Sequence, residues 1–119
     1  MNIEELRDYC LSLPGTTEDF PFDEVTLVFK IGGKMYLLTG LDGPFYINVK
    51  CDPDLAISLR ELYPAVQPGF HMNKKHWNTV EVDGSVSDKL LKQWIDQSYH
   101  LVRQSLSKAV KLKLETDGF

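Results

Sequence analysis

The first thirteen residues carry a hydrophobic pattern with the period of an α-helix. Apolar residues recur at intervals of three or four, at Ile3, Leu6, Cys10 and Leu13, which places them on one face of a helix. Asn2, followed three positions later by Glu5, is typical of a capping box at a helix start. The pattern therefore predicts an amphipathic helix over residues 2–13, ended by the Pro-Gly pair that follows.

From residue 25 the pattern changes to the period of two that is typical of β-strands. In the first strand Val25, Leu27, Phe29 and Ile31 alternate with Thr26, Val28 and Lys30. Gly32-Gly33 is a strong two-residue hairpin turn, and residues 34–39 return as a second strand. After a glycine-containing turn at 40–43, a third strand presents Phe45, Ile47 and Val49 on one face. The pattern predicts an antiparallel meander with one face to cover.

The stretch between the first helix and these strands, residues 16–24, is rich in acidic side chains. We expect it to form a loop. Phe20 and Phe22, which flank a proline, are expected to fold back as a hydrophobic plug rather than to face water.

The second half of the chain returns to the helical period. Asp52 is a predicted N-cap and Pro53 stands at the preferred first helical position, so a helix is expected from about 53 to 62. Its predicted buried stripe consists of Leu55, Leu59 and Leu62. Residues 66–69 are interpreted as a linker, residues 77–82 as a strand, and residues from Ser87 to about 109 as a last helix.

These elements follow the order α-β-β-β-α-β-α, which predicts an α+β fold: an antiparallel sheet with helices packed on one face. The other face is expected to be open, with Lys30, Lys34, Lys50 and Trp77 on or near it. We expect a single domain over residues 1–113, followed by a C-terminal tail at 114–119.

Composition adds limits on the class of protein. The chain has 119 residues, 43% hydrophobic and 25% charged, which is ordinary for a globular domain. Its apolar runs are far shorter than the ~20 residues that a membrane span needs. Two isolated cysteines predict reduced, partly buried thiols. We expect a cytoplasmic monomer that has no cofactor and does not bind membranes.

Charge is distributed unevenly along the chain, whose net charge is −4. Residues 1–24 hold seven acidic side chains and a single basic one, whereas residues 25–113 hold twelve basic and eight acidic ones. This asymmetry is compatible with a basic face behind an acidic N-terminal region.

The stretch from Pro68 to Gly84 concentrates side chains that suit binding. Lys74 and Lys75 could contact phosphates, which supply affinity independent of sequence, and the indole of Trp77 could stack on a base. The alternative is a solvated lysine pair beside a core tryptophan. Sequence chemistry alone leaves both interpretations open.

Catalytic and metal-binding patterns are weak by comparison. His71 and His76 are five residues apart, a spacing that places them on different faces of a helix or on opposite sides of a strand. Two isolated cysteines and three scattered histidines do not form a zinc pattern. No nucleophile, base and orienting group can be placed together, so we expect no metal site and no enzyme activity.

The run Gly-Phe-His-Met-Asn-Lys-Lys-His-Trp-Asn-Thr-Val at residues 69–80 resembles the MmcQ/YjbR family, as do the Leu-Pro-Gly-Thr-Thr-Glu run at 13–18 and Ser98-Tyr99. The resemblance implies a fold similar to the frataxin-like CyaY architecture. It also implies DNA binding through a double-wing arrangement of hairpins. The residues that match the family motif are His71, Asn73, Lys74, His76 and Trp77. A structural interpretation of the same motif has Asn73 capping, Trp77 packing and the histidines forming hydrogen bonds.

Three functional hypotheses follow. The leading one is DNA binding, through His71, Asn73, Lys74, Lys75, His76, Trp77, Lys50 and Arg60. The second is a frataxin-like metal or protein-partner site on the acidic residues Glu4, Glu5, Asp8, Glu18 and Asp19. The third is a small-ligand pocket near His71, His76 and Trp77.

Overall fold

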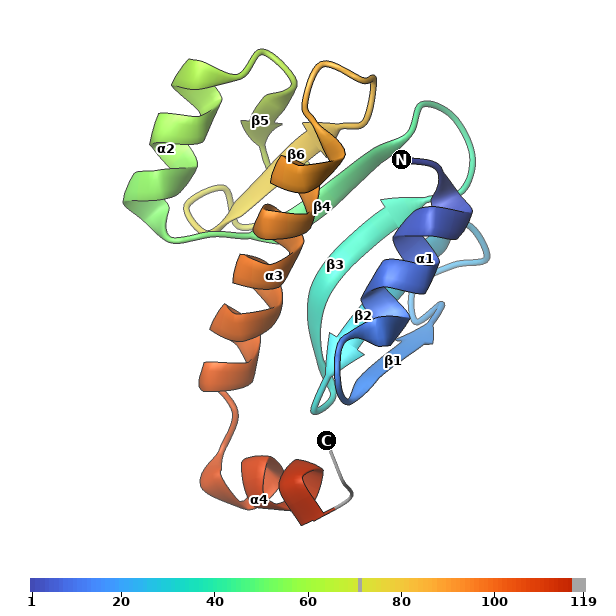
Figure 1. The fold of residues 1–119 in the computed structure, drawn as a ribbon, viewed down its shortest axis with the longest axis vertical. Helices are drawn as coiled ribbons and strands as arrows, with labels where there is room; N and C mark the ends of the chain where they lie inside the picture. Colours follow the sequence, from blue (N-terminus) through green and yellow to red (C-terminus); the bar gives the residue numbers. More distant parts are fainter. Residues whose placement is uncertain (71, 117–119) are drawn as a thin grey trace.

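A six-stranded antiparallel sheet organises the fold (Figure 1). The computed structural model describes residues 1–70 and 72–116. Within them the elements are α1 (Ile3–Ser12), β1 (Thr16–Asp19), β2 (Thr26–Ile31), β3 (Lys34–Gly40), β4 (Tyr46–Lys50), α2 (Pro53–Leu62), β5 (Val66–Pro68), β6 (Trp77–Glu81), α3 (Asp88–Gln104) and α4 (Lys108–Thr116). The predicted α+β class is confirmed.

The strands lie in the order β1-β2-β3-β4-β6-β5, and every neighbouring pair is antiparallel. Strands β1 to β4 therefore form the predicted meander, extended by one strand at its start. Helix α2 lies between β4 and β5 in sequence, so the chain leaves the sheet and returns as its last two strands.

Helices α1 and α3 lie across the same face of the sheet, and α4 lies beyond its β2–β3 end (Figure 1). Side chains that point toward them, such as Phe29, Leu37, Val49 and Val80, belong to the main buried core together with Leu91 and other helix residues. Burial of this apolar surface supplies most of the driving force for folding. The prediction that helices pack on one face is confirmed.

The helix starts form as the sequence indicates. Asn2 and Glu5 complete a reciprocal capping box at α1. Asp52 accepts hydrogen bonds from the first turn of α2, where Pro53 is the first residue. Ser87 caps α3 through Leu90. These caps satisfy donors that have no partner within the helix.

The predicted loop over residues 16–24 is wrong in its first part, because Thr16–Asp19 forms the edge strand β1. Strand β2 offers unpaired backbone donors and acceptors at this edge, and residues 16–19 pair with them. Asp19 also forms an ion pair with Lys30 on β2, at 3.2 Å. The linker expected at 66–69 likewise contains a strand, β5, which pairs with β6.

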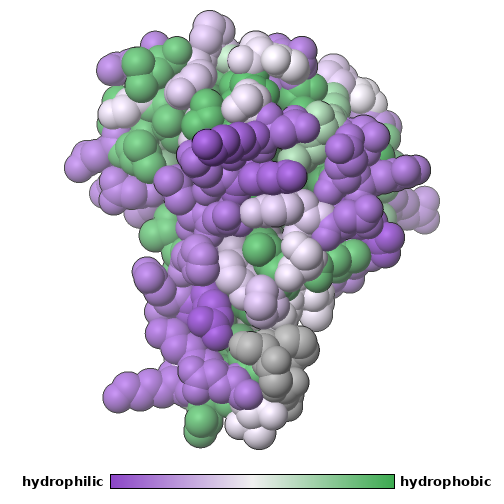
Figure 2. Space-filling model, viewed as in Figure 1, coloured by the Kyte–Doolittle hydropathy of each residue, from purple (hydrophilic) through white to green (hydrophobic). Residues whose placement is uncertain are grey.

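The predicted buried stripe of α2 is also partly wrong. Ala56 and Leu59 are buried, whereas Leu55 is 37% and Leu62 is 70% exposed. Helix α2 packs mainly on the narrow β5–β6 end of the sheet, so a thin stripe suffices to cover it. The exposed apolar residues account for green patches over α2 in Figure 2.

The last helix, expected to reach about residue 109, ends at Gln104, and a separate helix α4 follows. Ser105 caps the C-terminus of α3, and the hydroxyl of Ser107 accepts a hydrogen bond from the Val110 N–H in the first turn of α4. Since α4 continues to Thr116, the expected tail boundary at 113 falls inside a helix.

Both cysteines are free and buried, as the sequence predicts. Burial raises the pKa of the Cys10 thiol to about 12 and also raises the pKa of Cys51. Within residues 1–70 and 72–116, each helix is too short or too polar to pass through a lipid bilayer.

Candidate ligand-binding site

The face of the sheet opposite the helices carries a continuous row of side chains. Strand register aligns Val28 with Leu38, Leu38 with Asn48, and Asn48 with Thr79. Their sequence neighbours point into the helix-covered core, so this row points the other way. We call this surface the open face.

The strand register also shows which of the residues predicted for the open face lie on it. Lys30 and Lys50 alternate with core residues on β2 and β4, and Trp77 pairs directly with Lys50, so these three residues lie where the sequence predicts. Lys34 pairs with Ile31 at the hairpin end and therefore takes the helix side.

Residues 69–70 and 72–76 lie across part of the open face. The Gly69 N–H donates to the Trp77 carbonyl at 2.9 Å, and the Phe70 N–H donates to the Thr79 hydroxyl at 2.9 Å. A Cβ atom at position 69 would lie 2.9 Å from the Trp77 Cβ, so this close approach requires glycine.

The indole of Trp77 lies beneath this segment and is 8% exposed. It packs against Val28 and Leu38, with Met35 and Met72 at the edge of the cluster. Stacking of a nucleic-acid base on the Trp77 indole, one of the two interpretations of the sequence, would require displacing this packing. The structural interpretation of this residue is confirmed.

Arg60 is likewise committed to the fold. Its guanidinium donates to Asn78 Oδ1 at 2.7 Å and to the carbonyls of Lys74 and Trp77. These hydrogen bonds hold the turn before β6, so Arg60 stabilises the conformation of residues 74–78. The predicted phosphate contact by Arg60 would require breaking them.

Asn73 caps the short turn before β6 as predicted, because its side-chain oxygen accepts from the Lys75 N–H at 3.0 Å. His76 joins the turn to β4 through its backbone carbonyl, which accepts from Cys51. Lys74 Nζ donates to the Gly69 carbonyl at 3.2 Å, and both Lys74 and Lys75 are exposed. His71, also predicted as a site residue, lies outside the described residues.

A cavity of about 550 Å³ opens on this face between the loop before β2 and the folded-back segment. Its floor is the sheet and its walls are mainly apolar and aromatic. The lining residues are Phe22, Asp23, Thr26, Met35, Leu38, Thr39, Gly40, Tyr46, Asn48, Phe70, Met72 and Asn73. We call it the open-face cavity. A rigid floor with loop-borne walls is a common design for binding sites.

Asp23 supplies the charge at this cavity. Its carboxylate accepts hydrogen bonds from the N–H groups of Val25 and Thr26 and from the Thr26 hydroxyl. These bonds hold the pKa of Asp23 below its usual range, so the group is ionised at neutral pH. Among the described lining residues it is the single charged side chain.

Two aromatic rings divide the open-face cavity from a smaller one. Tyr46 and Phe70 meet edge to face, with ring centroids 6.3 Å apart. Both also line the neighbouring space of about 260 Å³, together with Gln67 and Thr79. The open face thus offers two adjoining compartments with a shared aromatic wall.

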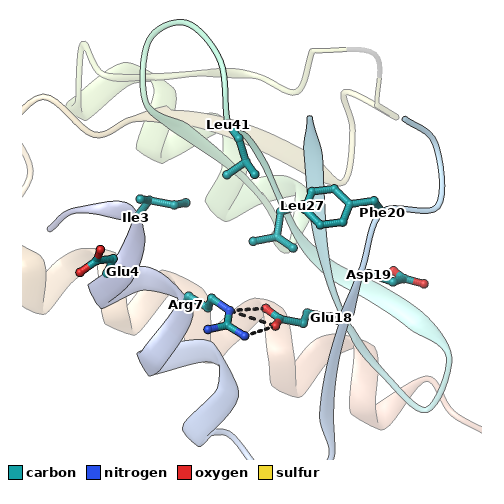
Figure 3. A pocket seen from close by; sticks show the side chains of 8 residues that line it. All are labelled: Ile3, Glu4, Arg7, Glu18, Asp19, Phe20, Leu27 and Leu41. Carbon is teal, nitrogen blue, oxygen red and sulfur yellow. Dashed lines mark hydrogen bonds and ion pairs between the residues drawn. The ribbon is translucent and has the colours of Figure 1, made fainter. Parts of the chain in front are cut away.

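A second large cavity lies on the helix side, between α1 and the β1–β2 end of the sheet, with a volume of about 500 Å³ (Figure 3). Its apolar walls include Phe20, Leu27 and Leu41. Arg7 and Glu18 lie at its border and pair with each other, at 2.8 and 2.9 Å from Nε to the two carboxylate oxygens. The other charged side chains of this lining are the carboxylates of Glu4 and Asp19.

The family model named YjbR matches residues 11–101. The chain belongs to the YjbR family. It is 40% identical to YbdF of Escherichia coli O157:H7 over 106 residues, which cover 88% of this chain and 87% of the relative. It is 33% identical to YjbR of Escherichia coli K12 over 113 residues, covering 94% and 90%.

Solved structures agree with this YjbR assignment. A crystal structure of a Deinococcus radiodurans protein superposes with a TM-score of 0.90 at 40% identity, covering 96% of this chain and 88% of the other. A Pseudomonas syringae protein gives a TM-score of 0.74 at 31% identity, covering 86% and 99%. The family resemblance of the 69–80 run is therefore confirmed.

The acidic residues of this YjbR-family chain do not converge into one site. Glu18 and Asp19 are neighbours on β1 and point to opposite sheet faces, where they pair with Arg7 and Lys30. Glu5 is engaged in the capping box. Among residues 1–70 and 72–116, no group of three potential metal-ligating side chains comes together. The predicted acidic cation site is therefore not assembled.

Sequence reasoning placed a ligand pocket near His71, His76 and Trp77, but neither His76 nor Trp77 lines the open-face cavity. The motif contributes its neighbours Phe70, Met72 and Asn73 instead. The predicted plug of Phe20 and Phe22 is also wrong, because these residues are 47% and 63% exposed.

The two phenylalanines border different cavities, Phe20 the helix-side one and Phe22 the open-face one. Sequence reasoning also missed Tyr46 and Asn48. The alternation on β4 holds the signal for them: if Ile47 and Val49 point inward, Tyr46 and Asn48 must point to the open face.

Proposed function

We propose that this protein is a small-molecule-binding domain and that its ligand occupies the open-face cavity. The observation that carries the proposal is a concave site of about 550 Å³ with apolar walls and a few polar groups. Small-molecule sites commonly have volumes of about 300–1,000 Å³ and this mixture of linings. A binding role without catalysis, in the cytoplasm, is part of the proposal.

The construction of the cavity supports this role. Its floor comes from adjacent central strands, which hold side chains more precisely than loops do. Its walls come from the two loops that carry Phe22 and Phe70, and both rings are more than half exposed. Exposed aromatic rings at the mouth of an apolar site gain contact area when a ligand enters.

Gly40 provides a test that fills the cavity instead of removing a wall. A Cβ atom there would have ordinary contacts, 3.7 Å from the Asp42 carbonyl oxygen and 3.9 Å from the Tyr46 hydroxyl. We expect Gly40→Leu to weaken binding of the neutral fluorophore N-phenyl-1-naphthylamine by more than about tenfold, because the new side chain occupies its space. Fluorescence titration measures the effect.

Leu41→Ala is the matched control, since Leu41 is adjacent in sequence and lines the helix-side cavity. It should leave the fluorophore's affinity unchanged. If the wild-type protein does not bind the fluorophore saturably, or if only Leu41→Ala weakens binding, the open-face proposal is wrong.

DNA binding is a second candidate, supported by the position of the lysines. The Cys51 N–H donates to the His76 carbonyl at 2.8 Å, which brings the Lys50 end of β4 beside the Lys74–Lys75 turn. Lys50, Lys74 and Lys75 thus come from two segments to one end of the open face. Phosphate contact by these side chains does not require the indole of Trp77.

Salt dependence tests this candidate. If the lysines bind phosphates, fluorescein-labelled DNA should bind much more weakly at about 200 mM salt than at about 50 mM, and Lys75→Ala should lower the salt slope by about 1. Lys111→Ala, on α4, is the control for net charge. Unchanged binding in Lys75→Ala would exclude this surface, and absence of binding at low salt would exclude the candidate.

A further inference from the structure

Asn48 is a polar side chain placed where an apolar one would be expected. It lies at the centre of β4 on the open face, with Leu38 on one side and Thr79 on the other. It is 7% exposed, and it forms part of the cavity floor. A primary amide buried to this degree requires hydrogen-bond partners.

One partner orients the amide. The Thr79 hydroxyl oxygen accepts the Phe70 N–H at 2.9 Å, so its own proton is available to donate to Asn48 Oδ1, 2.5 Å away. With Oδ1 facing Thr79, the Nδ2 group points to the other side. The Phe70 N–H of the folded-back segment therefore sets, through Thr79, the direction of an N–H donor in the cavity floor.

The Nδ2 group itself has no acceptor among residues 1–70 and 72–116. Within the same residues no fully enclosed side-chain nitrogen or oxygen lacks a hydrogen-bond partner, so Nδ2 must border accessible space. That space is the open-face cavity. At least one N–H of this mostly buried amide is thus available to a bound molecule.

The charge of the cavity lining limits which hydrogen-bond acceptors a ligand can present to Asn48. The carboxylate of Asp23 borders the same cavity, and the described lining holds no cationic side chain to balance it. An anionic acceptor would be repelled, whereas a neutral carbonyl or ring nitrogen would not. Around the amide, Leu38, Met35 and Phe70 offer surfaces that suit an apolar or aromatic body.

We propose that Asn48 is a specificity-determining residue whose Nδ2 donates to a neutral acceptor, a carbonyl or ring nitrogen, on an apolar aromatic ligand. The inference rests on the proposed function of the open-face cavity and adds the ligand class. The Tyr46–Phe70 wall would contact the aromatic body, and the smaller compartment beyond it leaves room for a substituent.

A pair of probes isolates this hydrogen bond. The first is prodan, a neutral naphthalene that carries a propionyl carbonyl and a dimethylamino group; the second is its propyl analogue, in which CH₂ replaces the carbonyl. Each is titrated by fluorescence into the wild-type protein and Asn48→Leu, a variant of similar size without the donor. The ratio of the two dissociation constants cancels differences in general hydrophobicity.

We expect this ratio to shift against prodan by about tenfold in Asn48→Leu, the effect of one lost hydrogen bond in a sheltered site. The propyl analogue should bind both proteins alike. Asn48→Asp is the second variant: it keeps the acceptor for Thr79 and replaces the donor with an acceptor, so it should weaken prodan binding even if Asn48→Leu does not fold.

The possible failures are distinguishable. In one outcome, both probes bind the wild-type protein and Gly40→Leu prevents the binding of both. If the ratio of their dissociation constants is then the same in the Asn48 variants that fold as in the wild-type protein, the role of Asn48 is refuted while the cavity remains a site. If neither probe binds, or Gly40→Leu leaves both unaffected, the proposed function fails and this inference fails with it.

Discussion

At the scale of single residues, Ser98 shows how a polar side chain can complete a backbone network. Strand β3 carries an extra residue at Tyr36, where its register with β2 shifts, and its pairing with β4 stops at Leu37 and Val49. From α3, the Ser98 hydroxyl donates to the Tyr36 carbonyl and accepts the Lys50 N–H. The serine thus replaces the missing ladder bond.

Ser98→Ala should therefore lower the free energy of unfolding by about 2–4 kcal/mol, because it leaves two backbone groups without partners. Urea denaturation followed by circular dichroism measures the change. Ser58→Ala, an exposed serine on α2 that bonds to its own helix, is the control and should have an effect within about 0.5 kcal/mol. Equal effects would contradict the bridging role.

At the scale of elements, the β2–β3 hairpin turn and α4 depend on each other. Gly32 and Gly33 have φ angles of +59° and +83°, the left-handed pair that a tight hairpin turn favours. A Cβ atom at Gly32 would lie 2.6 Å from Leu106 Cδ1 and 2.9 Å from Val110 Cγ1, whereas one at Gly33 would have no neighbour within 4 Å. The turn is therefore also the docking surface for α4.

Two alanine variants separate backbone strain from packing. Gly33→Ala should cost about 1–2 kcal/mol of unfolding free energy through the left-handed backbone alone. Gly32→Ala should cost about 1 kcal/mol more, because Leu106 is buried and has little room to move. It should also speed hydrogen exchange in residues 108–116. Equal costs and equal exchange in the two variants would show that α4 does not pack on the turn.

At the scale of the whole molecule, the sheet separates the main hydrophobic core on one face from the proposed binding cavity on the other. The helix-covered face holds the main core, including both cysteines, while the open face holds the cavity and the cluster around Trp77. A ligand on the open face would leave the main core intact. Changes to the cavity can therefore be tested without dismantling the fold.

The two thiols provide a measurement of that core. Because burial raises the pKa of Cys10 to about 12 and that of Cys51 as well, reaction with Ellman's reagent at pH 8 should be slow in native buffer. Both thiols should become reactive together as urea unfolds the protein. The variants Cys10→Ser and Cys51→Ser each leave one thiol to be followed alone. Rapid reaction of either thiol without urea would contradict the burial of both cysteines in the same core.

The sequence by itself determined what depends on local chemistry. Helix starts at Asn2, Asp52 and Ser87 follow from side chains that cap their own first turns. The β2–β3 turn follows from two adjacent glycines, and alternation assigns the inward face of β2 and β4. The 69–80 run predicted the family, and the element order predicted the α+β class.

Tertiary structure decided what depends on partners distant in sequence. Strand β1 forms because the edge of β2 is unpaired, and α2 buries a narrower stripe because it meets only the end of the sheet. Trp77 and Arg60 carry suitable chemistry for nucleic acid, but packing commits both to the fold. The cavity requires Phe22, Asn48 and Phe70, residues from three segments whose meeting no local pattern specifies.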